Sequence, residues 1–351
     1  MLFRHTLNCK IKSTNTIVLK QFLRYRFLIV LFFWCSAMTI GHRWGLFNEH
    51  FFMSVTMSFG AFIAGSTSEG GGAVAFPVMT IFAGISPPVA RDFSMMIQSV
   101  GMSAAALTIT TNSIIVEWRA IRFAMMGGCL GMFLGLEWLS PLLPPPVVKL
   151  FFVSLWLAFA CVLVLRLKMP LQDAIQEKIS NFSKLDILRL MCVGFIGGVI
   201  TSLSGSGLDI VTFLLLVLFY NINEKVATPT SVVLMAGISI IGFAWRASPF
   251  TAPIATESWN YWWVCVPIVV VFAPLGATFI QKRSRHFIVM LLFISILVQF
   301  IGAQILVPES KELAGFSILT FASTLLFLWL LNRNLFKKYR SHSVQKSLLQ
   351  E

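Results

Sequence analysis

The chain has 351 residues, of which 57% are hydrophobic and only 12% are charged, with a formal net charge of +13. A soluble protein is typically about 25% charged, so this composition excludes an ordinary soluble enzyme and predicts a membrane protein. The basic residues gather in blocks between apolar segments, which is typical of loops beside anionic membrane lipid. No aromatic and basic face accompanies these blocks, so we expect no nucleic-acid partner.

The chain begins with a basic segment, residues 1–26, followed by the apolar run 27–41. A signal peptide has a shorter basic region and ends at a small-residue cleavage site, and neither feature is present here. We therefore expect an uncleaved membrane anchor. Further apolar spans are predicted near residues 92–113, 121–140, 147–166, 226–247, 259–280, 286–306 and 313–332.

Two more apolar segments, residues 51–84 and 190–220, contain a glycine-rich break. Each is too long for one membrane span and too short for two spans of ~20 residues. We therefore predict two hairpins, each made of two short helices that meet at the break.

The two broken segments are diverged copies of one pattern, in residues 60–94 and 194–231. The matching positions are Phe62–Gly65 with Phe195–Gly198, Gly70–Gly72 with Gly205–Gly207, and Val89, Ala90 and Ser94 with Val226, Ala227 and Ser231. Paired, glycine-interrupted apolar segments at corresponding places in two halves indicate the binding site of a transporter.

The basic blocks predict the topology, because cytoplasmic loops are enriched in Lys and Arg. If each hairpin returns to the side from which it enters, residues 1–26, the linker 167–189 and the tail 333–351 all lie in the cytoplasm. The transmembrane repeats are then residues 27–166 and 190–332. Three spans separate the hairpins, so the hairpins enter from opposite sides. The fold class predicted is an all-α polytopic membrane protein with an inverted-topology repeat and two discontinuous helical hairpins.

A glycine-rich break at membrane depth exposes backbone N–H groups that lipid cannot satisfy. At the start of a half-helix such groups form a cradle for an anion, and nearby hydroxyl groups add neutral donors. The candidate substrate-binding residues are Thr67, Ser68, Gly70, Gly71, Gly72, Ser204, Gly205, Ser206, Gly207, Thr228, Thr230 and Ser231. The alternative is that the glycines form only packing turns, and that Thr228, Thr230 and Ser231 only cap a helix.

Glu69 and Asp209 are the only charged residues within the predicted hairpins. A charge at the bilayer centre costs roughly 2.5–3.5 kcal/mol, so it usually faces a cavity or a partner. Burial disfavours the ionised form of a carboxyl group, which suits proton coupling. We predict Glu69 and Asp209 as coupling residues; the alternative is that each caps a helix terminus.

Other residues carry structural predictions. Gly127, Gly131 and Gly135 form two GxxxG steps, which favour close helix packing. The cysteines and histidines show no metal-ligand spacing, and no nucleotide-binding motif is present, so we expect no metal site and no cofactor.

The sequence GFIGGVITSLSGSGLDIVTFLLLVLFYNINEKVATPTS resembles the second repeat of the sulfite exporter TauE/SafE family, and GAFIAGSTSEGGGAVAFPVMTI resembles the first. The likeness covers roughly residues 50–332. It implies a multi-pass permease of a bacterial inner membrane, with a small anion such as sulfite or an organosulfonate as its solute. The chain departs from the commonest first motif at Ser66–Glu69.

Two other functions are considered. Ser204–Gly207 approaches the GxSG motif of an intramembrane serine protease, but no histidine lies deep in a span to serve as the general base. A passive anion channel is the other alternative, and no sequence feature distinguishes it from a carrier.

Overall fold

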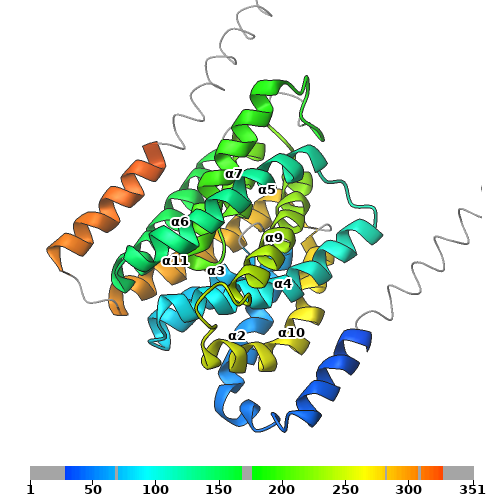
Figure 1. Ribbon diagram of the computed structural model, residues 1–351. Helices are drawn as coiled ribbons and strands as arrows, with labels where there is room; N and C mark the ends of the chain where they lie inside the picture. The colour runs from blue at the N-terminus through cyan, green and yellow to red at the C-terminus, as the bar shows by residue number, and fades with distance from the viewer. Residues whose placement is uncertain (1–27, 68–69, 168–175, 281–282, 307–309, 327–351) are drawn as a thin grey trace, which may run out of the picture.

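The computed structural model describes residues 28–67, 70–167, 176–280, 283–306 and 310–326, and these residues are almost entirely helical (Figure 1). Six of the described helices are long and apolar enough to cross a membrane, which confirms the all-α polytopic class. The helix bounds are Leu28–Ile40, α2 Leu46–Ser66, α3 Gly70–Pro77, α4 Pro87–Thr111, α5 Trp118–Leu134, α6 Pro145–Leu167, α7 Lys184–Ser204, α8 Leu208–Leu214, α9 Glu224–Arg246, α10 Thr256–Ile280, α11 Arg285–Leu306 and a helix over 311–326.

Three of these helices continue as irregular turns. α3 continues to Phe82, α5 to Leu142 and α8 to Phe219, each through a π-helical stretch. The predicted segments 1–26 and 333–351 lie outside the described residues. Within the predicted linker 167–189, residues 176–183 form no helix, residues 184–189 belong to α7, and Gln176 pairs with Ile222 in an isolated bridge.

The first arm of each hairpin is longer than predicted. α2 and α7 have 21 residues each, so each is about 31 Å long, and α7 is one of the six helices that are long and apolar enough to cross a membrane. α7 begins six residues earlier than expected because Ser183 and Asp186 form a capping box, in which each side chain accepts the backbone N–H of the other. The expectation of two short helices per hairpin is therefore wrong for the first arm and holds only for the second.

Both broken segments nevertheless fold back on themselves. A β-carbon placed at Gly197 of α7 would lie 2.7 Å from the Leu208 Cα at the start of α8. The Tyr220 hydroxyl donates to Asp186 at 2.9 Å, so the second segment returns to the end at which it began. In the first segment, Gly60 of α2 lies against Val74 of α3.

The helices form two sets of three that run in opposite directions. One set is α2, α4 and α10, and the other is α5, α7 and α9. Within each set the helices run parallel, because residue numbers rise together along the contacting helices. In the first set the contacts are Ser54 with Val264, Phe62 with Gly276, Val89 with Ser258 and Met96 with Trp262. The contacts that align the second set are Gly127 with Met191, Gly131 with Phe195, Glu117 with Thr230 and Glu137 with Trp245.

Contacts between α4 and α9 show that the two sets are antiparallel. Arg246 at the end of α9 binds Asp92 at the start of α4, and Gly242 one turn earlier lies against Met95. We call this end of the molecule the Arg91 end, and the opposite end, where α5 and α9 begin, the Glu117 end. α2, α4 and α10 start at the Arg91 end, and α5, α7 and α9 start at the Glu117 end.

The predicted glycine packing on α5 is confirmed. A β-carbon at Gly127 or Gly131 would lie 2.0 Å from a backbone carbonyl oxygen of α7, and one at Gly135 would lie 2.1 Å from the Ser202 hydroxyl. The α2–α10 pair is equally close, since a β-carbon at Gly65 would lie 2.0 Å from the Ala273 carbonyl oxygen. Small residues at these positions let the helix backbones touch.

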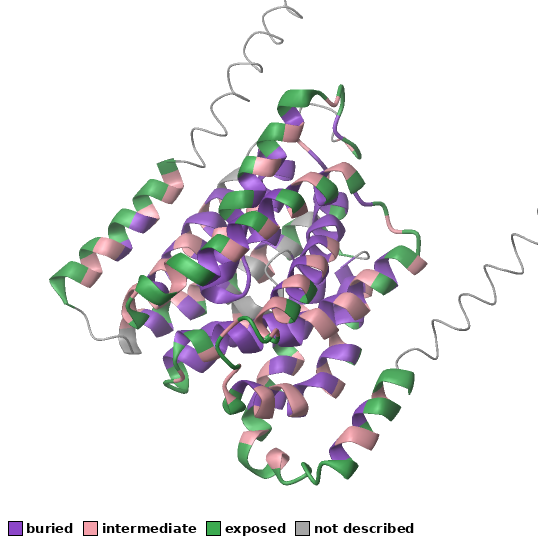
Figure 2. Cartoon of the chain, viewed as in Figure 1, coloured by how far each residue is buried: buried purple, intermediate pink, exposed green. Residues whose placement is uncertain are grey.

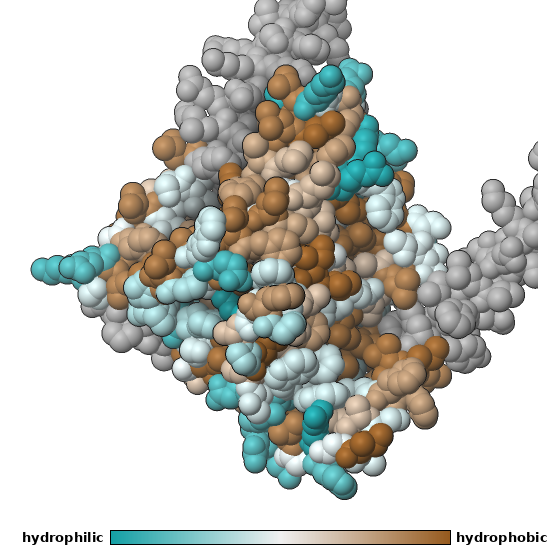
Figure 3. Space-filling view, in the orientation of Figure 1, coloured by the Kyte–Doolittle hydropathy of each residue, from teal (hydrophilic) through white to brown (hydrophobic). Residues whose placement is uncertain are grey.

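Buried residues line the inside of this arrangement (Figure 2), and apolar side chains form large patches on the face seen in Figure 3. Phe59, Leu130 and Leu275, for example, are exposed on α2, α5 and α10. Exposed apolar side chains on long helices are what a surface in contact with lipid requires.

Candidate functional site

The second break is a sharp turn between α7 and α8. α7 ends at Ser204, and Gly205 has φ +80°, a left-handed conformation that glycine adopts without strain. The Gly205 N–H donates to the Thr201 carbonyl at 2.7 Å, which closes the last turn of α7. α8 begins three residues later at Leu208.

Three backbone N–H groups of this break, those of Gly205, Gly207 and Leu208, already have acceptors. The Asp209 carboxylate folds back and accepts the Gly207 N–H at 2.8 Å, and the Ser206 hydroxyl lies 3.3 Å from the same carboxylate. The Thr201 hydroxyl accepts the Leu208 N–H at 3.0 Å. The side chain of Asp209 therefore fills the place that the sequence assigned to an anionic substrate, and in this conformation it caps α8.

The other hydroxyl group of the break is also turned inward. Ser204 donates to the Ser206 carbonyl at 2.8 Å. Ser204, Ser206 and Asp209 are all at most 2% exposed. The break is thus a buried polar turn in an apolar bundle.

A polar face of α4 packs directly against this turn. A β-carbon at Gly205 would lie 2.5 Å from Ser94 Cβ and 2.8 Å from the Arg91 carbonyl oxygen. Gln98, one turn beyond Ser94, donates from Nε2 to the Gly205 carbonyl at 3.1 Å. Ser94 and Gln98 are at most 1% exposed, and Ser94 Oγ and Gln98 Oε1 have no hydrogen-bond partner among the described residues.

Sequence reasoning did not assign Ser94 or Gln98 to the site. The sequence does contain a pattern that indicates them. Arg91, Ser94 and Gln98 are spaced i, i+3 and i+7 in a largely apolar span, so they share one face of the helix. What the sequence did not reveal is that this face meets a turn more than 100 residues away along the chain.

A buried ion cluster lies at the Arg91 end beside this face. Arg91 and Arg246 both bind the Asp92 carboxylate, at 2.7 and 2.8 Å, and Arg91 Nη1 also donates to the Ser140 hydroxyl at 2.6 Å. The side chains of Arg91, Asp92 and Arg246 are 7%, 5% and 13% exposed. Two guanidinium groups share one carboxylate, so the cluster carries one net positive charge.

The first break is only partly described. Thr67 follows α2, is 1% exposed and donates from its hydroxyl to the Ile63 carbonyl at 2.9 Å. Ser68 and Glu69 lie outside the described residues. Gly70, Gly71 and Gly72 form the first turn of α3.

The three hydroxyl residues of α9 lie at the Glu117 end, away from the second break. Thr230 accepts the Glu117 N–H at 2.9 Å and donates to the Val226 carbonyl, and Ser231 donates to the Thr228 carbonyl. Thr228 Oγ1 has no partner among the described residues. The structure therefore places these three residues on the start of α9 and does not bring them to the turn at Gly205.

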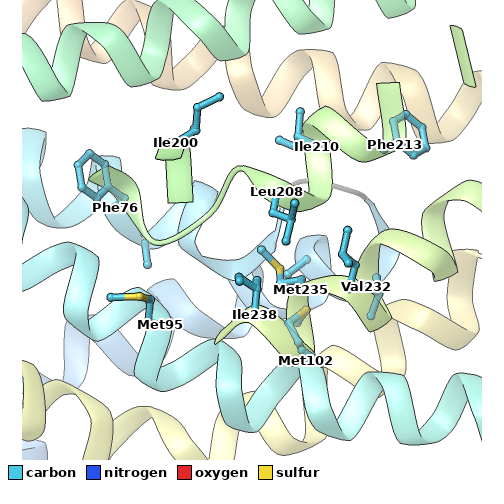
Figure 4. Packing of buried hydrophobic residues seen from close by; sticks show 14 of the residues in the cluster. Phe76, Met95, Met102, Ile200, Leu208, Ile210, Phe213, Val232, Met235 and Ile238 are labelled. Carbon is cyan, nitrogen blue, oxygen red and sulfur yellow. The ribbon is translucent and has the colours of Figure 1, made fainter. Parts of the chain in front are cut away.

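The two breaks lie toward opposite ends of the bundle. The end of α2 packs on Ala273 and Gly276, near the Glu117 end of α10, whereas Gly205 packs on Ser94, near the Arg91 end of α4. Buried apolar side chains occupy the region between α4, α8 and α9 (Figure 4). They include Met102, Leu208, Met235 and Ile238.

Two surface pockets lie at the Arg91 end. One of about 890 Å³ is lined by residues from the segment before α2 and from the starts of α2 and α10, among them Arg43, Glu49 and Trp263. The other, of about 350 Å³, is lined by residues that include Arg246 and Thr251. Neither pocket is lined by a residue of the breaks.

The described residues contain no group of three His, Cys, Asp or Glu side chains that could hold a metal ion. The model of the sulfite exporter TauE/SafE family matches residues 53–305, which is most of the chain. No curated protein and no solved structure matches. The family consists of transporters and not of enzymes, which excludes the protease alternative. The chain thus belongs to the sulfite exporter TauE/SafE family, and it is a multi-pass membrane transporter of sulfite or related anions.

Proposed function

We propose that this chain is a secondary transporter of a small anion such as sulfite or an organosulfonate, and that it works by alternating access. The observation that carries the proposal is the position of the two breaks. They belong to helix sets that run in opposite directions, they lie toward opposite ends, and buried apolar side chains fill the region between α4, α8 and α9. An inverted repeat with such a barrier suits a carrier that exposes its site to one side at a time.

The apolar layer also favours a carrier over a passive channel. A channel needs a continuous wet path, whereas Met102, Met235 and Ile238 are each at most 2% exposed. In a carrier, this layer would have to part on one side of the substrate and close on the other.

The proposed orientation places the Glu117 end in the cytoplasm of a bacterial inner membrane, with both chain termini on that side. Arg119, Arg122, Lys184 and Arg189 lie near this end, as the positive-inside rule requires. Membrane lipid is the surrounding partner, and the solute is a small anion.

Asp209 offers a route to proton coupling. When ionised, its carboxylate holds the Gly207 N–H and the Ser206 hydroxyl. Protonation would weaken these charge-assisted hydrogen bonds and release the donors for an anionic substrate. In this proposal Glu69 is the corresponding carboxylate of the first break, and Thr67, Ser68 and Gly70–Gly72 line that half of the site. Thr228, Thr230 and Ser231 are proposed to serve the half of the site that opens toward the cytoplasm.

Sulfite counterflow in proteoliposomes tests the function. We expect saturable exchange of labelled sulfite that is driven further by an imposed pH gradient. Asp209→Asn fixes the neutral form, so exchange should persist while accumulation along the pH gradient is lost. Glu49→Gln is the matched control, because it makes the same chemical change at an exposed carboxylate.

Two results would contradict parts of this proposal. Non-saturable flux without counterflow would make the chain a channel. Wild-type accumulation by the Asp209→Asn variant would reduce Asp209 to a helix cap.

A further inference from the structure

The amide of Gln98 has only one possible orientation. Its neighbour is the Gly205 carbonyl oxygen, which can only accept a hydrogen bond, so Nε2 must face it, as the 3.1 Å contact shows. The side-chain oxygen Oε1 therefore points away from Gly205. It is buried and has no donor among the described residues.

A buried acceptor without a donor is costly, and most such groups in proteins are satisfied. Ser94, one turn nearer the Arg91 end, also has a buried hydroxyl without a partner. The two residues lie on the same face of α4 and both meet the second break. Together they offer one acceptor, Gln98 Oε1, and one group that can donate or accept, Ser94 Oγ.

We propose that the species bound between this face of α4 and the second break is a monoanion that carries an O–H group, such as hydrogen sulfite. The O–H of the anion donates to Gln98 Oε1, and an anionic oxygen accepts the Ser94 hydroxyl. The single net positive charge of Arg91, Asp92 and Arg246 matches a charge of minus one. This inference rests on the proposed function, and it narrows the substrate class.

Binding at this place requires a movement of the hairpin. Gly205 is in direct contact with Ser94 in the present conformation. The anion reaches Ser94 Oγ and Gln98 Oε1 when the tip of the hairpin moves off Ser94 while Gln98 Nε2 keeps its hydrogen bond to the Gly205 carbonyl.

The inference has a consequence for selectivity. A sulfonate without a hydroxyl group leaves Gln98 Oε1 unpaired, and sulfate brings a second negative charge. A site built to bind a hydroxyl group discriminates strongly against analogues that lack it. A proton then crosses the membrane on the substrate itself, so Asp209→Asn should lose only the accumulation that exceeds the equilibrium distribution of hydrogen sulfite.

Ligand-induced thermal stabilisation of the purified full-length protein tests the inference. The probes are sodium sulfite, methanesulfonate and sulfate, each over the pH range in which sulfite gains a proton. We expect wild-type protein to bind sulfite more tightly as the hydrogen sulfite fraction rises. It should bind methanesulfonate at least about tenfold more weakly, and the ratio of the two affinities should grow as the hydrogen sulfite fraction rises, because protonation of Asp209 affects both anions alike.

Gln98→Leu removes the acceptor and keeps the approximate volume. In this variant, the preference for sulfite over methanesulfonate should fall by about tenfold. Ser103→Ala is the control, since the Ser103 hydroxyl donates within α4 to the Ser99 carbonyl. If Gln98→Leu does not fold, the comparison of ligands on wild-type protein still decides the question.

The outcomes separate this inference from the proposed function. Equal binding of sulfite and methanesulfonate at every pH would overturn the inference and leave the anion transporter intact. Failure of all three anions to bind would count against the proposed function itself.

Discussion

The contact between the second break and α4 makes a quantitative prediction for Gly205→Ala. Alanine at φ +80° costs about 1–2 kcal/mol because its β-carbon crowds its own backbone. Its methyl group would also lie 2.5 Å from Ser94 Cβ and 2.8 Å from the Arg91 carbonyl oxygen. Such overpacking costs roughly a further 1–3 kcal/mol. We therefore expect a total destabilisation of about 2–5 kcal/mol.

Gly84→Ala separates the two contributions. Gly84 has a similar φ of +68°, but a β-carbon there meets no atom within 4 Å. This variant should lose only the backbone contribution of about 1–2 kcal/mol. Thermal unfolding of the two purified variants beside wild-type protein measures the difference. Equal destabilisation by both substitutions would refute the close approach of Gly205 to α4.

Two further predictions concern the ends of the bundle. Burial raises the pKa of Glu117, but hydrogen bonds from Arg119 and from the Ile179 N–H outweigh burial and lower it. Ionised Glu117 therefore stabilises the fold at any pH above the ordinary carboxyl pKa, and this stabilisation is lost as the pH falls through the lowered pKa of the native state. Glu117→Gln should lower the free energy of unfolding by about 1–3 kcal/mol at neutral pH. The difference in unfolding midpoint between the variant and wild type should vanish in acid. The orientation is tested with single cysteines in an otherwise cysteine-free chain. A cysteine at position 48 should react with an impermeant thiol reagent added outside the cell, and a cysteine at position 180 should not. External labelling at position 180 would contradict the proposed topology.

The sequence predicted the parts of the fold that depend on local pattern. Hydropathy located the spans that form α4, α5, α6, α9 and α10, and the glycine-rich breaks located both reversals of the chain. The GxxxG steps of α5 were also sufficient to predict close packing, because a helix face without side chains admits another backbone. The start of α7 was missed because polar residues in its first turns hid the helix from a hydropathy argument, although Ser183 and Asp186 carried a capping signal.

The candidate site was harder to predict because it depends on contacts between distant segments. The anion cradle was predicted only from the backbone N–H groups of the break. The sequence did not decide whether the Asp209 carboxylate would itself accept one of these N–H groups, as it does for Gly207. Which side of α4 would face Gly205 follows only from the packing of the two helix sets. Arg246, 154 residues from Asp92, joins the ion cluster for the same reason.

The ion cluster also resolves a difficulty that the sequence posed. Glu69 and Asp209, the charges within the hairpins, are both negative and would repel an anionic substrate. Arg91 and Arg246 share one carboxylate, so one positive charge remains two helical turns before Gln98 on the same face of α4. Two turns rise about 10 Å, and at an effective dielectric constant of about 20 one positive charge at that distance attracts a monoanion by about 1.5–2 kcal/mol. Different residues can therefore attract the anion and exchange the proton. Arg91 and Arg246 attract the anion, and Asp209 takes up a proton and releases the hydrogen-bond donors of the break.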